Sequence, residues 1–93
     1  MSRNTSVIIT IISDKWEEVN EYINNVIDRG TTLYPVYGGY TKKERMEIKT
    51  TVSKKQAEKT KEEILKIDPN CFLTLTNSKG VFGEGFQSRF SDN

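Results

Sequence analysis

The sequence predicts an α+β fold in which a single antiparallel sheet carries two helices on one face. Its apolar residues alternate between a strand-like and a helix-like period, in the order strand, helix, strand, strand, helix, strand. Two signatures of a helix start, Asp14 with Glu17 and Ser53 with Gln56, follow directly on strand-like runs. A chain of 93 residues has room for one such domain, placed at 1–93 with its core at about 6–86.

The first third of the chain predicts a strand followed by a helix. The run VIITII at 7–12 is β-branched with only Thr10 polar, which is typical of a central strand or of a strand covered on both faces. Asp14 and Glu17 form a D-x-x-E variant of the capping box, so a helix is expected from there, with Gly30 just past its end. The inner face of this helix comprises Trp16, Val19, Ile23, Val26 and Ile27.

The next two segments predict strands on either side of a glycine-rich turn. In TTLYPVY at 31–37, Pro35 cannot donate a hydrogen bond to a neighbouring strand, so the segment belongs at an edge of the sheet. Gly38 and Gly39 then release the backbone, because glycine allows positive φ angles and close approach. The residues at 46–52 alternate as in an antiparallel strand with one wet face; those expected to point inward are Met46, Ile48, Thr50 and Val52.

The second helix begins at a capping box of the form S-x-x-Q, made by Ser53 and Gln56. The segment DPN at 68–70 ends it, because proline and its neighbours favour a turn. Between these signals an apolar stripe indicates the buried face, and it comprises Ala57, Thr60, Ile64 and Ile67.

The final segments complete the pattern of a ferredoxin-like fold. CFLTLT at 71–76 predicts the last strand, and a turn is expected at 77–80. Two β-α-β halves with directly linked middle strands define this topology. Because crossover connections are right-handed, the first and third strands should lie at the centre, with both helices on one face.

Composition narrows the range of functions. The net charge of +1 provides no field that would attract nucleic acid, and the runs at 7–12 and 46–52 lack the aromatic residues that an RNA-binding sheet needs. The chain has no histidine, and its single cysteine, Cys71, cannot form an internal disulfide. No catalytic residue, metal site or cofactor is therefore expected, and we do not expect an enzyme.

The apolar run at 7–12 is too short for a signal peptide or for a membrane-spanning helix. This predicts a cytoplasmic domain.

Four short blocks carry a resemblance to a known family. They are DRGTT at 28–32, GGYT at 38–41, IDPNCF at 67–72 and VFGEGF at 81–86. In this order and spacing the chain, from 7 to 86, resembles the cytoplasmic C-terminal domain of the YitT family of bacterial membrane proteins. The resemblance implies a ferredoxin-like fold and, in many relatives, preceding membrane-spanning helices. More distantly the chain is similar to the PII-like signalling proteins, which oligomerise and bind nucleotides at subunit clefts.

The two glycine-rich blocks suggest a ligand site. Glycine amides can form an anion-binding concavity, while an aromatic ring offers a stacking face and an arginine a phosphate fork. The spacing matches neither a Rossmann nor a P-loop motif, and a purely structural role for the glycines remains the alternative. The candidate ligand-binding residues are Arg29, Thr31, Gly38, Gly39, Tyr40, Thr41, Gly83, Glu84, Gly85 and Phe86.

Two functions follow from these observations. The first is a regulatory or sensory domain that binds a small molecule, such as a nucleotide, is oligomeric, and is attached to a membrane protein in its relatives. The alternative is a self-association or docking module without a ligand, because this fold leaves one sheet face and its edge strands open.

Overall fold

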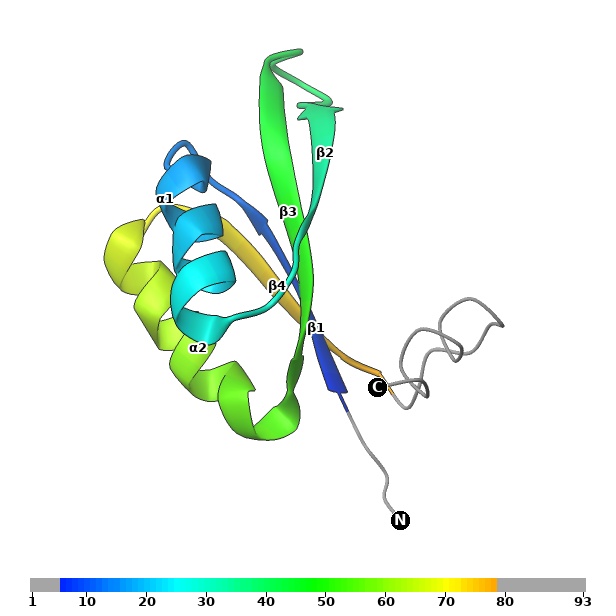
Figure 1. The fold of residues 1–93 in the computed structure, drawn as a ribbon. Helices are drawn as coiled ribbons and strands as arrows, with labels where there is room; N and C mark the ends of the chain where they lie inside the picture. Colours follow the sequence, from blue (N-terminus) through cyan, green and yellow to red (C-terminus); the bar gives the residue numbers. More distant parts are fainter. Residues whose placement is uncertain (1–5, 79–93) are drawn as a thin grey trace.

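The computed structural model describes residues 6–78 and arranges them as a four-stranded antiparallel sheet with helices on one side (Figure 1). The elements are β1 (Ser6–Ile12), α1 (Trp16–Tyr22), a π-helical turn η1 (Ile23–Ile27), β2 (Thr32–Tyr37), β3 (Glu44–Ser53), α2 (Lys54–Ile67) and β4 (Phe72–Ser78). The strand order is β2-β3-β1-β4, so the first and third strands are central. The ferredoxin-like prediction is confirmed, including the place of Pro35 on an edge strand.

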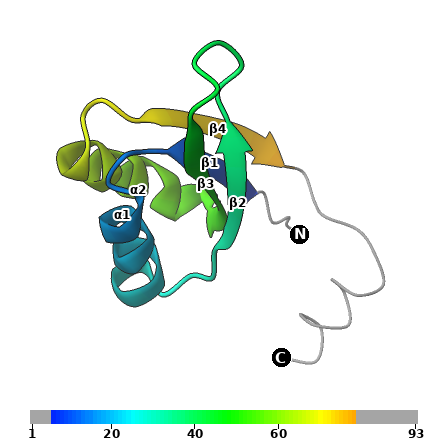
Figure 2. The ribbon, with the colours of Figure 1, turned by 90° about the horizontal axis from the view of Figure 1, so that it is seen from above.

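The core lies between the sheet and the helices, which cover the same face in both ribbon views (Figures 1 and 2). In β1 the buried and half-buried residues alternate, because successive side chains of a strand point to opposite faces. The register places Val7, Ile9 and Ile11 opposite Val52, Thr50 and Ile48 of β3. The buried apolar core comprises these residues other than Thr50, together with Val19, Ile23, Ala57 and Ile64.

The second helix begins as its sequence predicts. The Ser53 hydroxyl accepts a hydrogen bond from the Gln56 backbone N–H at 3.1 Å, and the Gln56 side chain accepts one from the Ser53 N–H at 3.1 Å. This reciprocal pair satisfies two donors that a helix start leaves open. The helix ends at Ile67, before Asp68 and Pro69, as predicted.

The first helix departs from its prediction at both ends. It begins at Trp16, and no side chain caps it, so the D-x-x-E capping box is wrong. The Asp14 carboxylate instead pairs with Arg45, 31 residues further along the chain. At the other end, Asp28 rather than Gly30 takes the left-handed conformation, with φ of 63°, which a short polar side chain tolerates.

The last turn of this helix is π-helical, and this changes which residues face the core. Val19 and Ile23 are fully buried, but Val26 is 69% exposed, contrary to its place on the predicted inner face. A π turn bonds residue i to i+5, so it is wider than an α turn and rotates the following residues away from a 3.6-residue stripe. Trp16 and Ile27 remain packed against the edge of the core.

The last strand is longer than predicted. Asn77 and Ser78, expected in a turn, continue β4 and pair with Val7 and Ser6 of β1.

No helix within residues 6–78 covers the second face of the sheet, and we call it the open face (Figure 2). The strand registers place Thr10, Lys49 and Thr74 side by side on this face. Tyr34 also belongs to it, because the Lys49 ammonium lies 5.3 Å from the centre of the Tyr34 ring. The apolar members of the face are Ile8, Ile12, Tyr34, Val36 and Phe72.

Candidate functional site

The predicted glycine-rich block at 38–41 forms the tip of the hairpin between β2 and β3. The Gly38 N–H donates to the Lys43 carbonyl at 2.9 Å, and the Lys42 N–H donates to the Gly38 carbonyl at 3.0 Å. The sequence suggested positive φ angles at Gly38 and Gly39. In the structure the residue of this turn with a positive φ is instead Lys42, at 61°. Gly38 is needed for space, since a Cβ there would lie 2.6 Å from the Thr41 hydroxyl oxygen.

The other two residues of this block are only partly consistent with a ligand site. Tyr40 is 97% exposed, so its ring is available for stacking but contributes to no enclosed site in residues 6–78. The Thr41 hydroxyl accepts a hydrogen bond from the Lys43 N–H at 3.2 Å and thereby shapes the turn. Within the described part of the chain the hairpin tip is an exposed turn rather than a cavity.

Arg29 and Thr31 lie at the opposite end of β2 from the hairpin (Figure 1). The six residues of this strand separate them from Gly38 by about 20 Å. The Arg29 guanidinium donates to the Gln56 side chain at 3.2 Å, and the Thr31 hydroxyl donates to the Asn20 side chain at 2.6 Å. Both contacts tie the connection before β2 to the helices, so the structure does not bring these two residues together with residues 38–41.

Gly83, Glu84, Gly85 and Phe86 lie outside the described residues. Their predicted meeting with the hairpin therefore stays a prediction.

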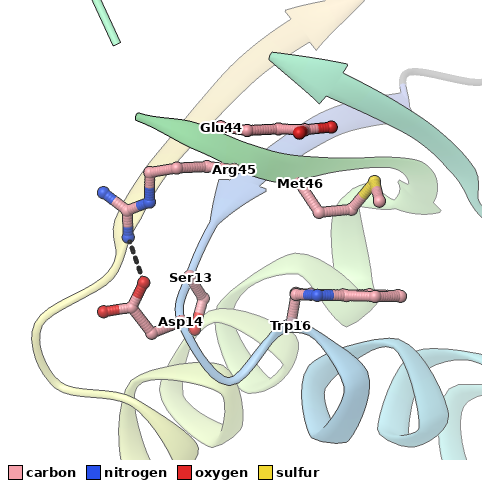
Figure 3. Close-up of a pocket in the computed structure, with 6 residues that line it drawn as sticks. All are labelled: Ser13, Asp14, Trp16, Glu44, Arg45 and Met46. Carbon is pink, nitrogen blue, oxygen red and sulfur yellow. Dashed lines mark hydrogen bonds and ion pairs between the residues drawn. The ribbon is translucent and has the colours of Figure 1, made fainter. Parts of the chain in front are cut away.

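A cleft of about 320 Å³ lies between the end of β1 and the start of β3 (Figure 3). We call it the β1–β3 cleft. One side comes from the connection after β1 and the first residue of α1, and the other from the first three residues of β3. Its lining residues are Ser13, Asp14, Trp16, Glu44, Arg45 and Met46.

The cleft has an apolar end and a charged end. At the apolar end the Trp16 indole, from α1, and the Met46 side chain, from β3, are both half-buried and offer a flat ring and a polarisable thioether (Figure 3). At the charged end an Arg45 guanidinium nitrogen lies 3.0 Å from an Asp14 carboxylate oxygen. A ligand could thus find both a stacking surface and hydrogen-bonding groups here.

One hydrogen-bond donor of the Arg45 side chain has no acceptor among the described residues. Its Nε is buried and has no hydrogen-bond partner among residues 6–78, although Nη2 is used by Asp14. A buried donor without an acceptor is unfavourable. Because this atom has almost no accessible surface, a ligand would accept its hydrogen bond only after the Arg45 side chain had moved. The lining carries two carboxylates, Asp14 and Glu44, against one guanidinium.

A buried carboxylate holds the wall of the cleft in place. The Ser13 hydroxyl donates to Asp68, just past the end of α2, and accepts a hydrogen bond from the Lys15 N–H at 2.8 Å. The other Asp68 oxygen accepts from the Asn70 N–H at 2.9 Å. The hydrogen bond from Ser13, followed by that from Asn70, lowers the pKa of Asp68, so this carboxylate stays ionised in the folded protein.

Cys71 is half-buried and packs against the core. Burial, and then the charge of Asp68, raise the pKa of its thiol, which keeps it protonated and unreactive at neutral pH. Among the described residues, no group of three or more acidic or cysteine side chains is arranged to hold a metal ion.

Sequence reasoning placed most of the cleft residues elsewhere. It placed Trp16 and Met46 on the inward faces of their elements and gave Asp14 the role of a helix cap. The pairing of Ile12 with Glu47 is what brings the residues after β1 beside the start of β3. This register is a long-range property, and no local motif signals it.

The fold and strand order place the chain among ferredoxin-like α+β domains, and comparison with known proteins identifies its family. Residues 29–83 match the profile described as "Uncharacterized protein conserved in bacteria (DUF2179)". The chain belongs to this family. A structure of a DUF2179 protein from Eubacterium ventriosum superposes with a TM-score of 0.65 at 21% identity, covering 76% of this chain and 97% of that one, which supports the fold.

The relatives with curated sequences are longer than this chain. It is 42% identical over 82 residues to an uncharacterised protein in the cccA 5′ region of Bacillus sp. strain PS3, covering 88% of this chain and 55% of that protein. It is 32% identical over 83 residues to the UPF0750 membrane protein YxkD of Bacillus subtilis, covering 89% of this chain and 30% of that protein. The UPF0750 membrane protein YitT of the same organism is 22% identical over 88% of this chain and 29% of its own length, which confirms the YitT resemblance.

Two of these relatives, YxkD and YitT, are named as membrane proteins. In the part of this chain that the structure describes, neither helix has the length and apolar character needed to cross a bilayer.

Proposed function

We propose that this domain is a regulatory or sensory module that binds a small molecule in the β1–β3 cleft. The observation that carries the proposal is the buried Arg45 Nε, a donor without a partner in residues 6–78, at the edge of a cleft walled by Trp16 and Met46. A volume of about 320 Å³ is at the lower end of the range for ligand sites. In this proposal the domain is no enzyme, and its ligand sets its conformation or its contacts.

The longer relatives suggest what is regulated. YxkD and YitT are membrane proteins by name, and the chain matches about a third of each. A small domain in such a protein is suited to reporting a solute concentration on the cytoplasmic side of the membrane. This arrangement is the one we propose for proteins that carry the domain.

The lining of the cleft favours a particular class of ligand. Two carboxylates and one guanidinium line the cleft, and this balance disfavours a polyphosphate, because like charges repel in a partly desolvated site. A planar, heteroaromatic molecule suits the cleft better, since it can stack on Trp16 and offer an acceptor to the Arg45 guanidinium. Nucleobases, nucleosides and nucleoside monophosphates are therefore the first ligands to test.

Trp16 provides a direct assay, because it is the only tryptophan of the chain. Ligand stacking should change its fluorescence, and the same titration can be followed by the melting temperature, which a ligand of the folded state raises. We expect at least one ligand of the named class to change both signals with the same dissociation constant. If none changes either signal at millimolar concentration, the proposal is wrong.

Two arginine variants form a matched pair for this assay. Arg45→Gln removes the guanidinium from the cleft and should weaken binding at least tenfold. Arg29→Gln removes the same group at the far end of β2 and should leave the affinity unchanged. Equal weakening by both variants would show that the cleft is not the site.

A second candidate, a self-association module without a ligand, is favoured by the open face. That face exposes Phe72 to 68% and Tyr34 to 39%, and covering such side chains is favourable. A protein that oligomerises, but binds nothing in the cleft, would fit this candidate.

A further inference from the structure

The two edges of the sheet differ in how well they resist pairing with another strand. Edge strand β2 contains Pro35, which lacks a backbone donor, and its first residue lies opposite the exposed Lys49 of β3. Edge strand β4, with the sequence FLTLTNS, contains no proline, no glycine and no charged residue. Proteins usually protect an edge with such residues, so β4 has the features of a strand that accepts a partner.

The backbone of β4 has one side available for this partner. In the described part of the chain its only neighbouring strand is β1, with which it pairs from Phe72 to Ser78. The amide and carbonyl groups that alternate along a strand point to both sides, so about half of those in 72–76 face away from β1. Their hydrogen bonds are the general basis for adding a strand to a sheet.

We propose that β4 pairs with β4 of a second copy of this chain, antiparallel and about a two-fold axis at Thr74. This register sets Leu73 opposite the partner's Leu75, Phe72 opposite the partner's Thr76, and Thr74 opposite its own copy. Leucine then meets leucine on the helix-covered face, while threonine meets threonine or an aromatic ring on the open face, which are favourable cross-strand pairs. Because β4 carries no charge, the symmetric pairing brings no like charges together.

A neighbouring register is less favourable. An axis at Leu75 would set Leu73 opposite the partner's Asn77 and Phe72 opposite the partner's Ser78, and both are pairs of an apolar with a polar side chain. A shift of this kind also changes which side chains meet, so the side-chain pattern disfavours the axis at Leu75. The axis at Thr74 joins the two open faces into one continuous surface.

This inference gives a geometry to the self-association candidate and rests on it, but it does not depend on a ligand in the cleft. The test uses sedimentation velocity on the full chain over a concentration series. The expected result is a reversible rise in mass from 10.7 kDa toward twice that value. A monomer at every concentration would overturn both the inference and the self-association candidate.

Charge variants at the exposed Thr74 test the strand and the register together. Thr74→Lys would place two ammonium groups opposite each other and should weaken dimerisation at least tenfold, as should Thr74→Glu. An equimolar mixture of the two variants should restore the dimer, because residue 74 then faces the opposite charge. Thr51→Lys, at an exposed position of the same face on central strand β3, is the matched control and should dimerise like the unaltered chain.

Two further outcomes would overturn the pairing of β4 with β4 of a second copy. A dimer that persists in Thr74→Lys would keep the self-association candidate but overturn β4 pairing. A monomer that becomes a dimer when residues 79–93 are deleted would assign the β4 edge to the chain's own C-terminal segment, and this too would overturn the inference. Circular dichroism of every variant verifies that the fold is retained.

Discussion

Alanine substitutions at Ile23 and Val26 test the course of the first helix. The two residues are three positions apart, and a regular α-helix would place both on the inner face, as the sequence pattern predicts. In the structure Ile23 is fully buried, whereas Val26 is 69% exposed because the turn between them is π-helical. The two substitutions should therefore differ sharply in their effect on stability.

The magnitudes follow from burial. Ile23→Ala leaves a cavity beneath the helix and should lower the free energy of unfolding by about 3 kcal/mol. For a domain of this size that corresponds to a fall in Tm of about 10–25 °C. Val26→Ala removes little buried surface, so the change should stay within about 0.5 kcal/mol. The higher helix propensity of alanine even favours a slight gain in stability at this position.

Urea denaturation followed by circular dichroism measures both changes. The slope of unfolding free energy against urea should be the same for the two variants, so that the midpoints can be compared directly. If Val26→Ala lowers the midpoint nearly as much as Ile23→Ala does, Val26 belongs to the core and the π turn is wrong. A small effect of both would instead show that the helix is poorly packed on the sheet.

Three further predictions concern the helix cap, the buried carboxylate and the hairpin. Ser53→Ala should lower the unfolding free energy by about 1 kcal/mol, read from the urea midpoint, because the Gln56 N–H loses its acceptor. The lowered pKa of Asp68 stabilises the fold fully above its unfolded-state pKa of about 3.9 and loses this effect as the pH falls through the folded-state pKa. Asp68→Asn should therefore flatten the acid limb of a plot of urea midpoint against pH, and an unchanged limb would contradict the assigned hydrogen bonds. Gly38→Ala should lower Tm because its Cβ meets the Thr41 hydroxyl, whereas Gly39→Ala, with no atom within 4 Å of its Cβ, should leave Tm nearly unchanged.

Local sequence signals predicted the elements that depend on local interactions. The capping box at Ser53 involves residues only three positions apart, and Pro35 restricts its own strand, so both can be recognised without the rest of the fold. The prediction for the start of the first helix was wrong for a related reason. Its start resembles a capping box, but the Asp14 carboxylate finds a charged partner in Arg45, which a local pattern does not include.

The candidate site could not be predicted in the same way. The two sides of the β1–β3 cleft, residues 13–16 and 44–46, lie about 30 positions apart in the chain, and their meeting depends on which residue of β1 pairs with which residue of β3. The glycine-rich block, by contrast, was visible in the sequence because glycine marks a turn. Gly38 shapes the hairpin, while the unpaired Arg45 Nε lies at the start of β3.

The cleft and the β4 edge are joined by one short chain of hydrogen bonds. Ser13 lines the cleft, and its hydroxyl donates to Asp68, which in turn accepts the Asn70 N–H two residues before β4 begins. A ligand that shifted Ser13 would therefore disturb the connection that positions β4. Linkage is reciprocal. If such a ligand changed the dissociation constant of the dimer by some factor, dimerisation would change the affinity for the ligand by the same factor. If binding and self-association both occur, sedimentation at saturating ligand measures this coupling. An unchanged dimer dissociation constant would show that the two equilibria are independent and that the Ser13–Asp68 contact serves stability alone.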